Sequence, residues 1–240
     1  MGERSQTSAR REPQTKGTAA AVEGYRTMIE VTYIDHMGSD LSVVNAARVS
    51  FGKTHKAMTE GDTKLIKYLA KHKHMSPFGH AFASFHVKAP IFVARQLVKH
   101  KFLRWNEISR RYVDDLPEIY HPEKWRGRSA DKKQGSEGFI TQMETRSDQT
   151  VDHFYRIQCI NALDVYHDAI ATGVCPEQAR MILPQSTMTE WYWSGSLDAF
   201  IDMCNLRCKE DTQYETRLVA DYIRSEMLKL FPVSVEALVK

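Results

Sequence analysis

The chain has 240 residues, of which 42% are hydrophobic, 33 are Lys or Arg and 30 are Asp or Glu, giving a formal net charge of +3. This length and apolar content support one large domain with a genuine core. The net charge is too small to indicate nucleic-acid binding by itself. No segment has the length and apolar character of a signal peptide or a membrane-spanning helix, so we expect a soluble, cytoplasmic protein without a membrane partner.

The N-terminal residues differ in composition from the rest of the chain. Residues 1–27 are rich in Gly, Ser, Thr, Gln, Ala and Arg and show no apolar periodicity. This pattern predicts a disordered N-terminal tail followed by a single domain at residues 28–240.

The first half of the domain shows clear periodicities. Alternation of apolar and polar residues predicts strands at 29–34 and 81–87. Apolar residues at helical spacing predict a short helix at 40–48 and a longer one at 59–73. Residues 75–79 contain proline and glycine, which predict a turn.

The middle of the chain combines one helix with a long polar segment. Pro90 is suited to the first turn of a helix running to His100, after which residues 106–112 are expected to form a loop or an irregular extended segment. On that helix Gln96, Lys99 and His100 would share a face. Residues 121–150 are polar and glycine-containing, which predicts a mobile insertion.

The remaining elements are mainly helical. The periodicities predict helices at 151–172 and 176–183, a strand at 187–193, and a helix capped by Ser196. Thr212 and Glu215 have the spacing of a capping box for a long last helix. Strands and helices do not alternate strictly, so we expect the α+β class, with a mixed or antiparallel sheet packed against helices.

The four cysteines do not indicate a disulfide framework, so reduced thiols are expected. Cys204 and Cys208 would share a helix face. No second cysteine pair or histidine further along the chain completes a set of four ligands, so we expect no metal.

Residues 99–112 concentrate positive charge around a single carboxylate. The basic or potentially basic residues are Lys99, His100, Lys101, Arg104, Arg110 and Arg111. Their mutual repulsion would be offset by a bound phosphate or pyrophosphate. The alternative is a solvated basic surface.

The order of these residues resembles the signature of the flavin-dependent thymidylate synthases, R-H-R-x-x-S-x-N-E-x-S-x-R-Y. The matching positions are His100, Asn106, Glu107, Ser109, Arg111 and Tyr112. Lys99 and Lys101 replace arginines, and Arg104 replaces serine; lysine keeps the charge without the two-pronged guanidinium. Residues 76–80, 85–96, 177–180 and 205–207, the last followed by Gln213 and Glu215, also resemble the family, in its order.

The resemblance implies a methyltransferase that converts deoxyuridine monophosphate (dUMP) to dTMP. Methylenetetrahydrofolate would donate the carbon, FADH2 would carry the hydride and NADPH would be the reductant. The family further implies a homotetramer with shared active sites, in which the signature of one subunit meets Arg180 and Arg207 of another.

By family position, Arg207 would be catalytic, stabilising negative charge on the pyrimidine as an oxyanion hole does. The residues expected around dUMP are Gln96, Lys99, Glu107, Ser109, Arg110, Arg111, Arg180 and Arg207. Those expected around FAD are Ser76, Lys99, His100, Lys101, Asn106, Glu107 and Asp202. Without the resemblance, Arg207 would be interpreted as a helix-surface residue paired with Glu210 or Asp211.

Two other classes of function are open from the residues alone. One is a different enzyme, with Cys175 as a nucleophile or with a metal held by His72, His74, His80 and His86. The cysteine lacks the surrounding motif of cysteine-dependent thymidylate synthases, and the histidines lack compact ligand spacing. The other is a nucleic-acid-binding module in which Trp105 and Tyr112 stack on bases.

Overall fold

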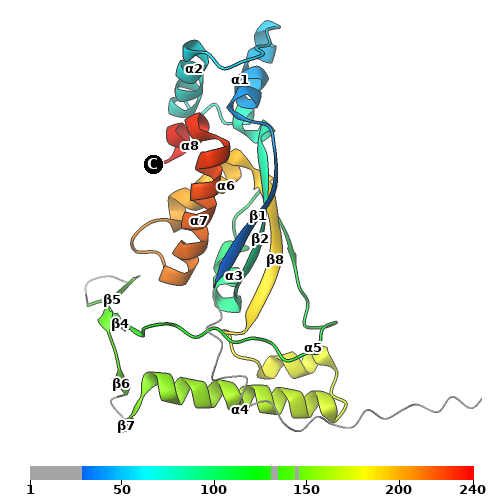
Figure 1. Cartoon of the computed structure of the whole chain (residues 1–240), viewed down its shortest axis with the longest axis vertical. Coiled ribbons are helices and arrows are strands. Elements are labelled where there is room, and N and C mark those ends of the chain that lie inside the picture. The colour runs from blue at the N-terminus through cyan, green and yellow to red at the C-terminus, as the bar shows by residue number, and fades with distance from the viewer. Residues whose placement is uncertain (1–28, 131–134, 144–145) are drawn as a thin grey trace, which may run out of the picture.

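A computed structural model describes residues 29–130, 135–143 and 146–240. The tail predicted at residues 1–27 lies outside the described residues. A four-stranded antiparallel sheet forms the centre of the domain (Figure 1), with strand order β1-β2-β8-β3. Its members are β1 (Glu30–Met37), β2 (Phe82–Pro90), β8 (Met188–Ser196) and β3 (Leu103–Glu107).

The two faces of the sheet follow the alternation in the sequence. On β2, the side chains of Ala83, Phe85 and Val87 are fully or almost fully buried. Side chains of the opposite face are only partly covered, and Ser84 there hydrogen-bonds Ser194 of β8 at 2.8 Å. One face of the sheet therefore supplies the core of the domain.

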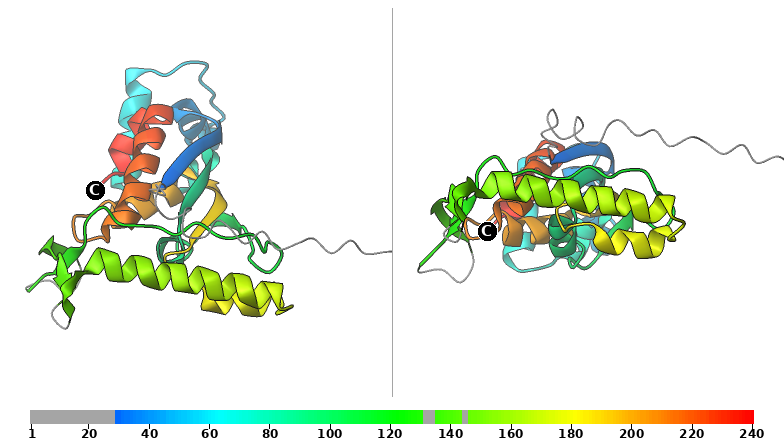
Figure 2. Two further views of the ribbon diagram at one scale, coloured as in Figure 1. Left: turned by 60° about the horizontal axis from the view of Figure 1, so that its bottom comes forward. Right: turned by 90° about the horizontal axis from the view of Figure 1, so that it is seen from below.

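Helices surround the sheet on one side and at both ends. They are α1 (Asp40–Arg48), α2 (Glu60–Lys71), α3 (Ile91–Leu97), α4 (Val151–Ala171), α5 (Pro176–Ala179), α6 (Leu197–Arg207), α7 (Tyr214–Leu230) and α8 (Pro232–Leu238), with 3₁₀ turns η1 (Val49–Phe51), η2 (Ser76–His80) and η3 (Arg180–Ile182). Figure 1 shows α6, α7 and α8 beside the sheet and α1 and α2 at one end. Figure 2 shows α4 lying across the other end, with α5 beside it.

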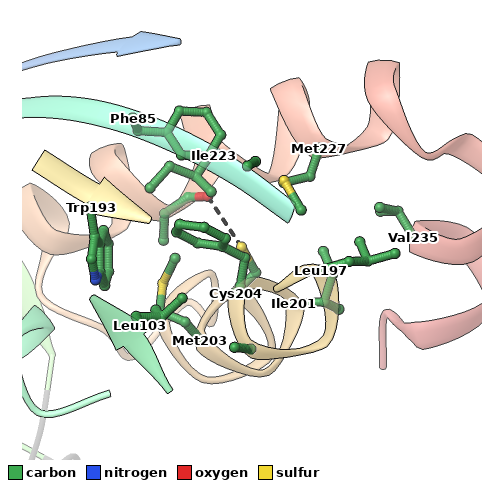
Figure 3. Close-up of a cluster of buried hydrophobic side chains, with 14 of the residues drawn as sticks. Phe85, Leu103, Trp193, Leu197, Ile201, Met203, Cys204, Ile223, Met227 and Val235 are labelled. Atoms are coloured by element: carbon green, nitrogen blue, oxygen red, sulfur yellow. Dashed lines mark hydrogen bonds between the residues drawn. The ribbon is translucent and has the colours of Figure 1, made fainter. Parts of the chain in front are cut away.

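The core is built where the sheet packs against α6, and Figure 3 shows Phe85 and Trp193 of the sheet near Cys204 of α6. Phe200 of α6 meets Phe85 at 5.3 Å between ring centroids and Trp193 at 5.5 Å, both edge-to-face. Cys204, one turn further along, is buried, and its thiol donates to the Ala220 carbonyl oxygen at 3.7 Å. This packing fixes α6, and with it the position of its last residue, Arg207.

The predicted fold class is confirmed as a single domain with an antiparallel sheet packed against helices. The helix at 40–48 is confirmed to the residue, and the predicted helices at 59–73 and 151–172 and strands at 29–34, 81–87 and 187–193 are all present. The helix predicted at 176–183 is shorter in the structure: α5 ends at Ala179, and the 3₁₀ turn η3 follows it.

The helix predicted to reach His100 ends at Leu97, so Lys99 and His100 lie in a turn rather than on a shared helical face with Gln96. Phe102 has φ +67°, and the chain then enters β3, whose residues 106 and 107 fall within the loop or irregular extended segment predicted at 106–112. Pairing with β8 here outweighs the weak strand preference of the segment itself. Gly195 permits it, because a Cβ there would lie 2.4 Å from Leu103 Cδ2.

The capping box predicted from Thr212 and Glu215 is wrong. Helix α7 has Gln213 at its N-cap, and the Thr212 hydroxyl donates instead to the Leu206 carbonyl oxygen at 3.2 Å. Glu215 is buried and pairs with Arg126, so a charge contact from a distant segment determines its position.

The insertion predicted at 121–150 contains two short antiparallel hairpins in its described part. They are β4 (Arg126–Arg128) with β5 (Ser136–Phe139), and β6 (Gln142–Met143) with β7 (Arg146–Thr150). Its predicted mobility is not tested by these contacts.

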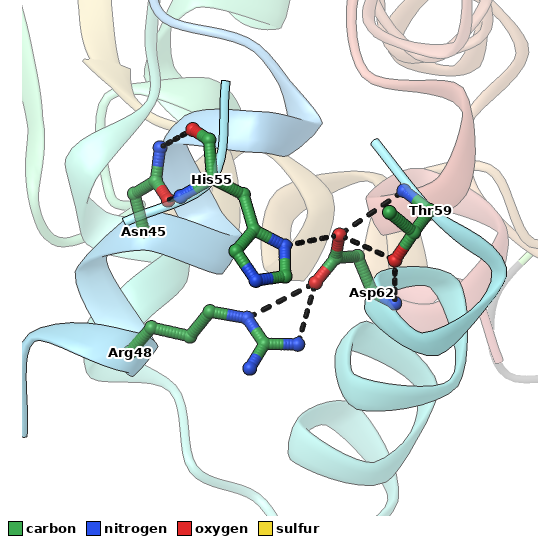
Figure 4. A network of polar contacts seen from close by, with 5 residues as sticks. All are labelled: Asn45, Arg48, His55, Thr59 and Asp62. Carbon is green, nitrogen blue, oxygen red and sulfur yellow. Dashed lines mark hydrogen bonds and ion pairs between the residues drawn. The ribbon is translucent and has the colours of Figure 1, made fainter. Parts of the chain in front are cut away.

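A buried carboxylate connects α1, the following loop and α2 (Figure 4). Asp62 is fully buried and accepts hydrogen bonds from Arg48 Nη2 at 2.6 Å, His55 Nδ1 at 2.8 Å and Thr59 Oγ1 at 2.8 Å. Burial alone would raise the pKa of Asp62, but the hydrogen bonds from His55, Thr59 and Arg48 outweigh it and hold the pKa well below its usual 3.8. Asn45 bonds the backbone of His55 and completes the network.

Candidate active site

Arg207 joins the end of α6 to the turn after α3. Its Nε donates a hydrogen bond to His100 Nε2 at 2.9 Å, and its Nη2 donates to the backbone oxygen of Gln96 at 3.1 Å. Within the described residues it forms no ion pair with Glu210 or Asp211, so the helix-surface interpretation of Arg207 is wrong. Two of its five N–H donors are thus engaged by the protein, whereas those on Nη1 have no partner in the described part of the chain.

The contact with Arg207 determines the protonation state of His100. Guanidinium groups only donate hydrogen bonds, so His100 Nε2 must be an unprotonated acceptor. Burial and the charge of Arg207 lower the pKa of His100, opposed by Asp202. Burial also lowers the pKa of Arg207, which nonetheless stays charged.

A cleft of about 750 Å³ lies beside this contact. Gln96 and Arg207 line it, together with aromatic residues and the start of α7. The aromatic lining residues are Phe92, Tyr120, Trp125, Tyr155 and Tyr214. Its size and its mixture of aromatic walls with a few polar groups are typical of a small-molecule site.

The insertion forms one wall of the cleft. Lys124, Arg126 and Ser136 line it from this segment. Arg126 forms an ion pair with Glu215 at 2.7 Å, which fastens the insertion to the first turn of α7. Sequence reasoning missed both residues as part of the site, because no motif connects positions so far apart.

Glu107 and its neighbours lie along β3 and the turn after it. Glu107 accepts hydrogen bonds from Trp105 Nε1 at 3.0 Å and from Thr189 Oγ1 at 2.7 Å. Arg110 Nη1 is paired with the Asp115 carboxylate at 3.0 Å. The backbone N–H of Arg111 donates weakly to Ser109 Oγ at 3.4 Å, leaving both side chains near the surface.

The two lysines at the start of the signature are available to a ligand. Lys99 and Lys101 are exposed and form no ion pair with any described residue. Asn106 is likewise exposed on β3. These groups can bind an anion without first breaking an internal contact.

Three predicted residues form no direct contact with Arg207 within the described part of the chain. Arg180 is exposed in η3 and donates to the Glu177 carbonyl oxygen at 3.2 Å, and Ser76 is exposed at the start of η2. Asp202 lines a second cavity of about 590 Å³, whose cationic walls are Lys67, Lys71, Lys73 and Lys240. No hydrogen bond or ion pair between described residues connects these three to Arg207.

The histidines and the cysteine considered for a metal site or a nucleophile lie in different surroundings from Arg207. His72 packs on Tyr68 at 4.3 Å between centroids, and His86 contacts Glu190 at 3.1 Å. Across the described ranges, no group of three or more His, Cys, Asp or Glu is arranged to hold a metal ion. Cys175 is an exposed free thiol at the start of α5.

Comparison with known proteins gives a consistent result. The sequence model of the thymidylate synthase complementing protein family matches residues 32–233. A flavin-dependent thymidylate synthase of Thermus thermophilus is 38% identical over 204 residues, which are 85% of this chain and 73% of the relative. The chain belongs to the flavin-dependent thymidylate synthase family. The expectation of a methyltransferase enzyme of this family is thereby confirmed.

Other relatives of the family agree with this assignment. The flavin-dependent thymidylate synthase of Kosmotoga olearia is 37% identical and is matched over 90% of each chain. Among solved structures, a UMP/dUMP methylase from Streptomyces cacaoi superposes with a TM-score of 0.76 at 30% identity, covering 88% of this chain and 95% of that one. No helix within the described residues is long and apolar enough to span a membrane.

Proposed function

We propose that this family member methylates dUMP to dTMP, with methylenetetrahydrofolate as the carbon donor, FAD as the hydride carrier and NADPH as the reductant. The Streptomyces neighbour is described as a UMP/dUMP methylase bound with 5-Br dUMP, which supports dUMP as the substrate. The observation that carries the proposal is the Arg207 guanidinium, held by His100 and Gln96 at the wall of the cleft.

Arg207 is suited to act on a pyrimidine by electrostatics. Its position is fixed by two hydrogen bonds, so little reorganisation is needed when negative charge develops on a bound base. The donors on Nη1 are free of described protein partners and can reach a carbonyl oxygen of the substrate. We assign to Arg207 the polarisation of the base, which the family resemblance implies in place of an enzyme nucleophile.

For dUMP, the proposed contacts combine hydrogen-bond acceptors, donors and cations. They are Gln96, Lys99, Glu107, Ser109, Arg110, Arg111, Arg180 and Arg207. Arginines suit the phosphate through bidentate hydrogen bonds, which Lys99 replaces with a point charge. Arg110 would have to exchange its contact with Asp115 to take part.

We propose that the active site is shared between subunits of a homotetramer. Arg207 contacts His100 of its own chain, whereas Arg180 is exposed in η3 and, within the described residues, contacts neither Arg207 nor His100. A neighbouring subunit is therefore the better source of the Arg180 that completes the site. Large exposed apolar side chains support an assembly, among them Phe51 (79% exposed), Phe102 (82%) and Met181 (78%).

The donors proposed for FAD fit a cofactor that carries a pyrophosphate. Lys99 and Lys101 are exposed cations without an ion pair in the described part of the chain, and Asn106 adds an amide. We propose that these residues hold FAD with Ser76, His100, Glu107 and Asp202. When bound and reduced, the flavin would supply the hydride that completes the transferred methyl group.

The function is tested by the visible spectrum of the purified protein and by product formation. We expect bound flavin absorbance, or its appearance on reconstitution with FAD, and conversion of dUMP to dTMP that depends on methylenetetrahydrofolate and NADPH. UMP should be assayed in parallel, since the Streptomyces neighbour is described as acting on both nucleotides. A colourless protein that cannot be reconstituted, or one that leaves dUMP unchanged, would refute the proposal.

Replacing Lys99 with alanine should weaken FAD or dUMP binding about tenfold, because one charge-assisted contact is lost. Isothermal titration with each ligand measures this. The control is Lys229→Ala, which removes an exposed lysine paired with Glu226 on α7. Unchanged affinities for both ligands in the Lys99 variant would exclude Lys99 from both sites.

Binding of dUMP should weaken in acid beyond the effect of the ligand's own titration. The pKa of His100 in the folded protein is lowered from its usual 6.5. His100 is therefore a neutral hydrogen-bond acceptor at neutral pH, and this acceptor is lost as the pH falls through the folded-state pKa. Protonation would place a cation against Arg207. A His100→Gln variant keeps an acceptor that does not titrate, so its dissociation constant should depend less on pH below about 6.5. Identical profiles would contradict this role.

A further inference from the structure

A chain of hydrogen bonds connects the insertion to the Arg207 end of the cleft. Arg126 Nη2 lies 2.7 Å from both carboxylate oxygens of Glu215. Glu215 Oε2 also accepts a hydrogen bond from Gln213 Nε2 at 3.2 Å, and Gln213 Oε1 accepts one from Gln96 Nε2. The backbone oxygen of Gln96 then accepts the bond from Arg207. We call Arg126, Glu215, Gln213 and Gln96 the anchoring chain.

The anchoring chain depends on a buried carboxylate. Glu215 has a side chain only 3% exposed, and a buried carboxylate is strongly disfavoured unless it is paired and hydrogen-bonded. Arg126 supplies the opposite charge, and its guanidinium also lies 5.0 Å from the centre of the Tyr214 ring. The hydroxyl of Tyr120 adds a longer contact to Glu215 at 3.4 Å. The insertion is therefore held at Arg126 by charge and by stacking.

The carboxylate also determines the direction of every hydrogen bond in the chain. An ionised carboxylate can only accept, so the Gln213 amide must turn its nitrogen toward Glu215 and its oxygen toward Gln96. Gln96 must then turn its nitrogen toward Gln213. The oxygen and nitrogen of an amide have nearly the same shape, but the hydrogen bonds of the anchoring chain distinguish them.

The orientation of Gln96 affects what the cleft presents to a ligand. Gln96 lines the cleft, and its Oε1 has no partner within the described residues. The fixed amide thus offers a carbonyl oxygen to a donor on the ligand. If the anchoring chain were broken, the amide could rotate and present its NH₂ group instead.

Resting on the proposed function, we infer that Arg126 of the insertion is a positioning residue for the nucleotide. It acts through Glu215 and Gln213 and holds the Gln96 amide with its oxygen toward bound dUMP. The role requires no contact between Arg126 and the reacting atoms. It gives the insertion a part in substrate affinity besides forming a wall.

Two substitutions test separate links of the anchoring chain. Arg126→Met removes the charge and keeps the aliphatic stem, whereas Gln213→Met at an exposed position breaks the link to Gln96 and leaves Arg126 paired with Glu215. Each should raise the dissociation constant and KM for dUMP about tenfold, the effect of one lost hydrogen bond. The kcat should stay within about threefold, and FAD affinity should not change. The double variant should be no weaker than either single one. Arg126→Lys, which keeps the charge, should recover most of the affinity.

The matched control is Glu226→Gln, which breaks an exposed ion pair with Lys229 on the same helix and should bind dUMP as the wild type does. Wild-type affinity in both Arg126→Met and Gln213→Met would overturn the inference. Weakening in Arg126→Met alone would also overturn it, because the effect would then not pass through Gln213. Should Arg126→Met fail to fold, the exposed Gln213→Met variant decides by itself. A wild-type protein that binds no dUMP would instead refute the proposed function.

Discussion

Replacing Arg207 with lysine or alanine should lower the turnover of dUMP by about 10²–10³-fold, the usual effect of removing one preorganised charge-stabilising donor. Lysine keeps a positive charge but cannot hold His100 and Gln96 while also presenting a planar pair of donors to the base. Release of tritium from 5-tritiated dUMP measures the step directly. Bound flavin, followed by its visible absorbance, should be retained.

The control for this experiment is an arginine with the same chemistry elsewhere. Arg224→Lys changes a half-exposed residue of α7 that pairs with Asp221 at 3.1 Å, so it should leave turnover unchanged. Wild-type tritium release in Arg207→Ala would exclude Arg207 from catalysis. Loss of flavin together with activity would instead give Arg207 a role in cofactor binding.

The sequence predicted best those elements whose periodicity is also satisfied in the folded domain. Helix α1 is found at the predicted residues, and the alternation on β2 separates buried from partly exposed side chains. Strand β3 was missed, because Leu103 and Trp105 give only a brief apolar alternation within a charge-rich segment, and the strand forms by pairing with β8. Helix α4 was predicted correctly, but Ile157 and Val165 of its expected apolar face are 37% and 54% exposed in the single chain.

The candidate site divides in a similar way. The family resemblance implied that Arg207 meets the signature of another subunit, whereas in the structure Arg207 contacts His100 and the Gln96 backbone of its own chain. The resemblance included Glu215 among the family-like positions without giving it a role in the site, and it did not indicate Arg126, because a pair 89 positions apart leaves no local pattern. Glu215 even matched a capping motif. Its buried pairing with Arg126 is a tertiary effect that local spacing cannot reveal.

Replacing Asp62 with asparagine should lower the free energy of unfolding by about 3 kcal/mol, or the melting temperature by roughly 6–12 °C. The change leaves Arg48 without its carboxylate partner and weakens the contacts with His55 and Thr59. Thermal unfolding followed by circular dichroism measures the difference. The control is Asp221→Asn, which disrupts a half-exposed pair with Arg224 and should shift the melting temperature little.

The same carboxylate predicts a pH dependence of stability. The pKa of Asp62 is lower in the folded protein than its usual 3.8, so the folded state holds fewer protons on this group than the unfolded state does. Its stabilising contribution is complete above about pH 5 and is lost progressively as the pH falls below about 4. The melting temperature of the wild type should therefore decline more steeply with acid than that of Asp62→Asn. Parallel declines would show that other carboxylates dominate acid unfolding, and that the Asp62 network fastens α1 to α2 without controlling the response to pH.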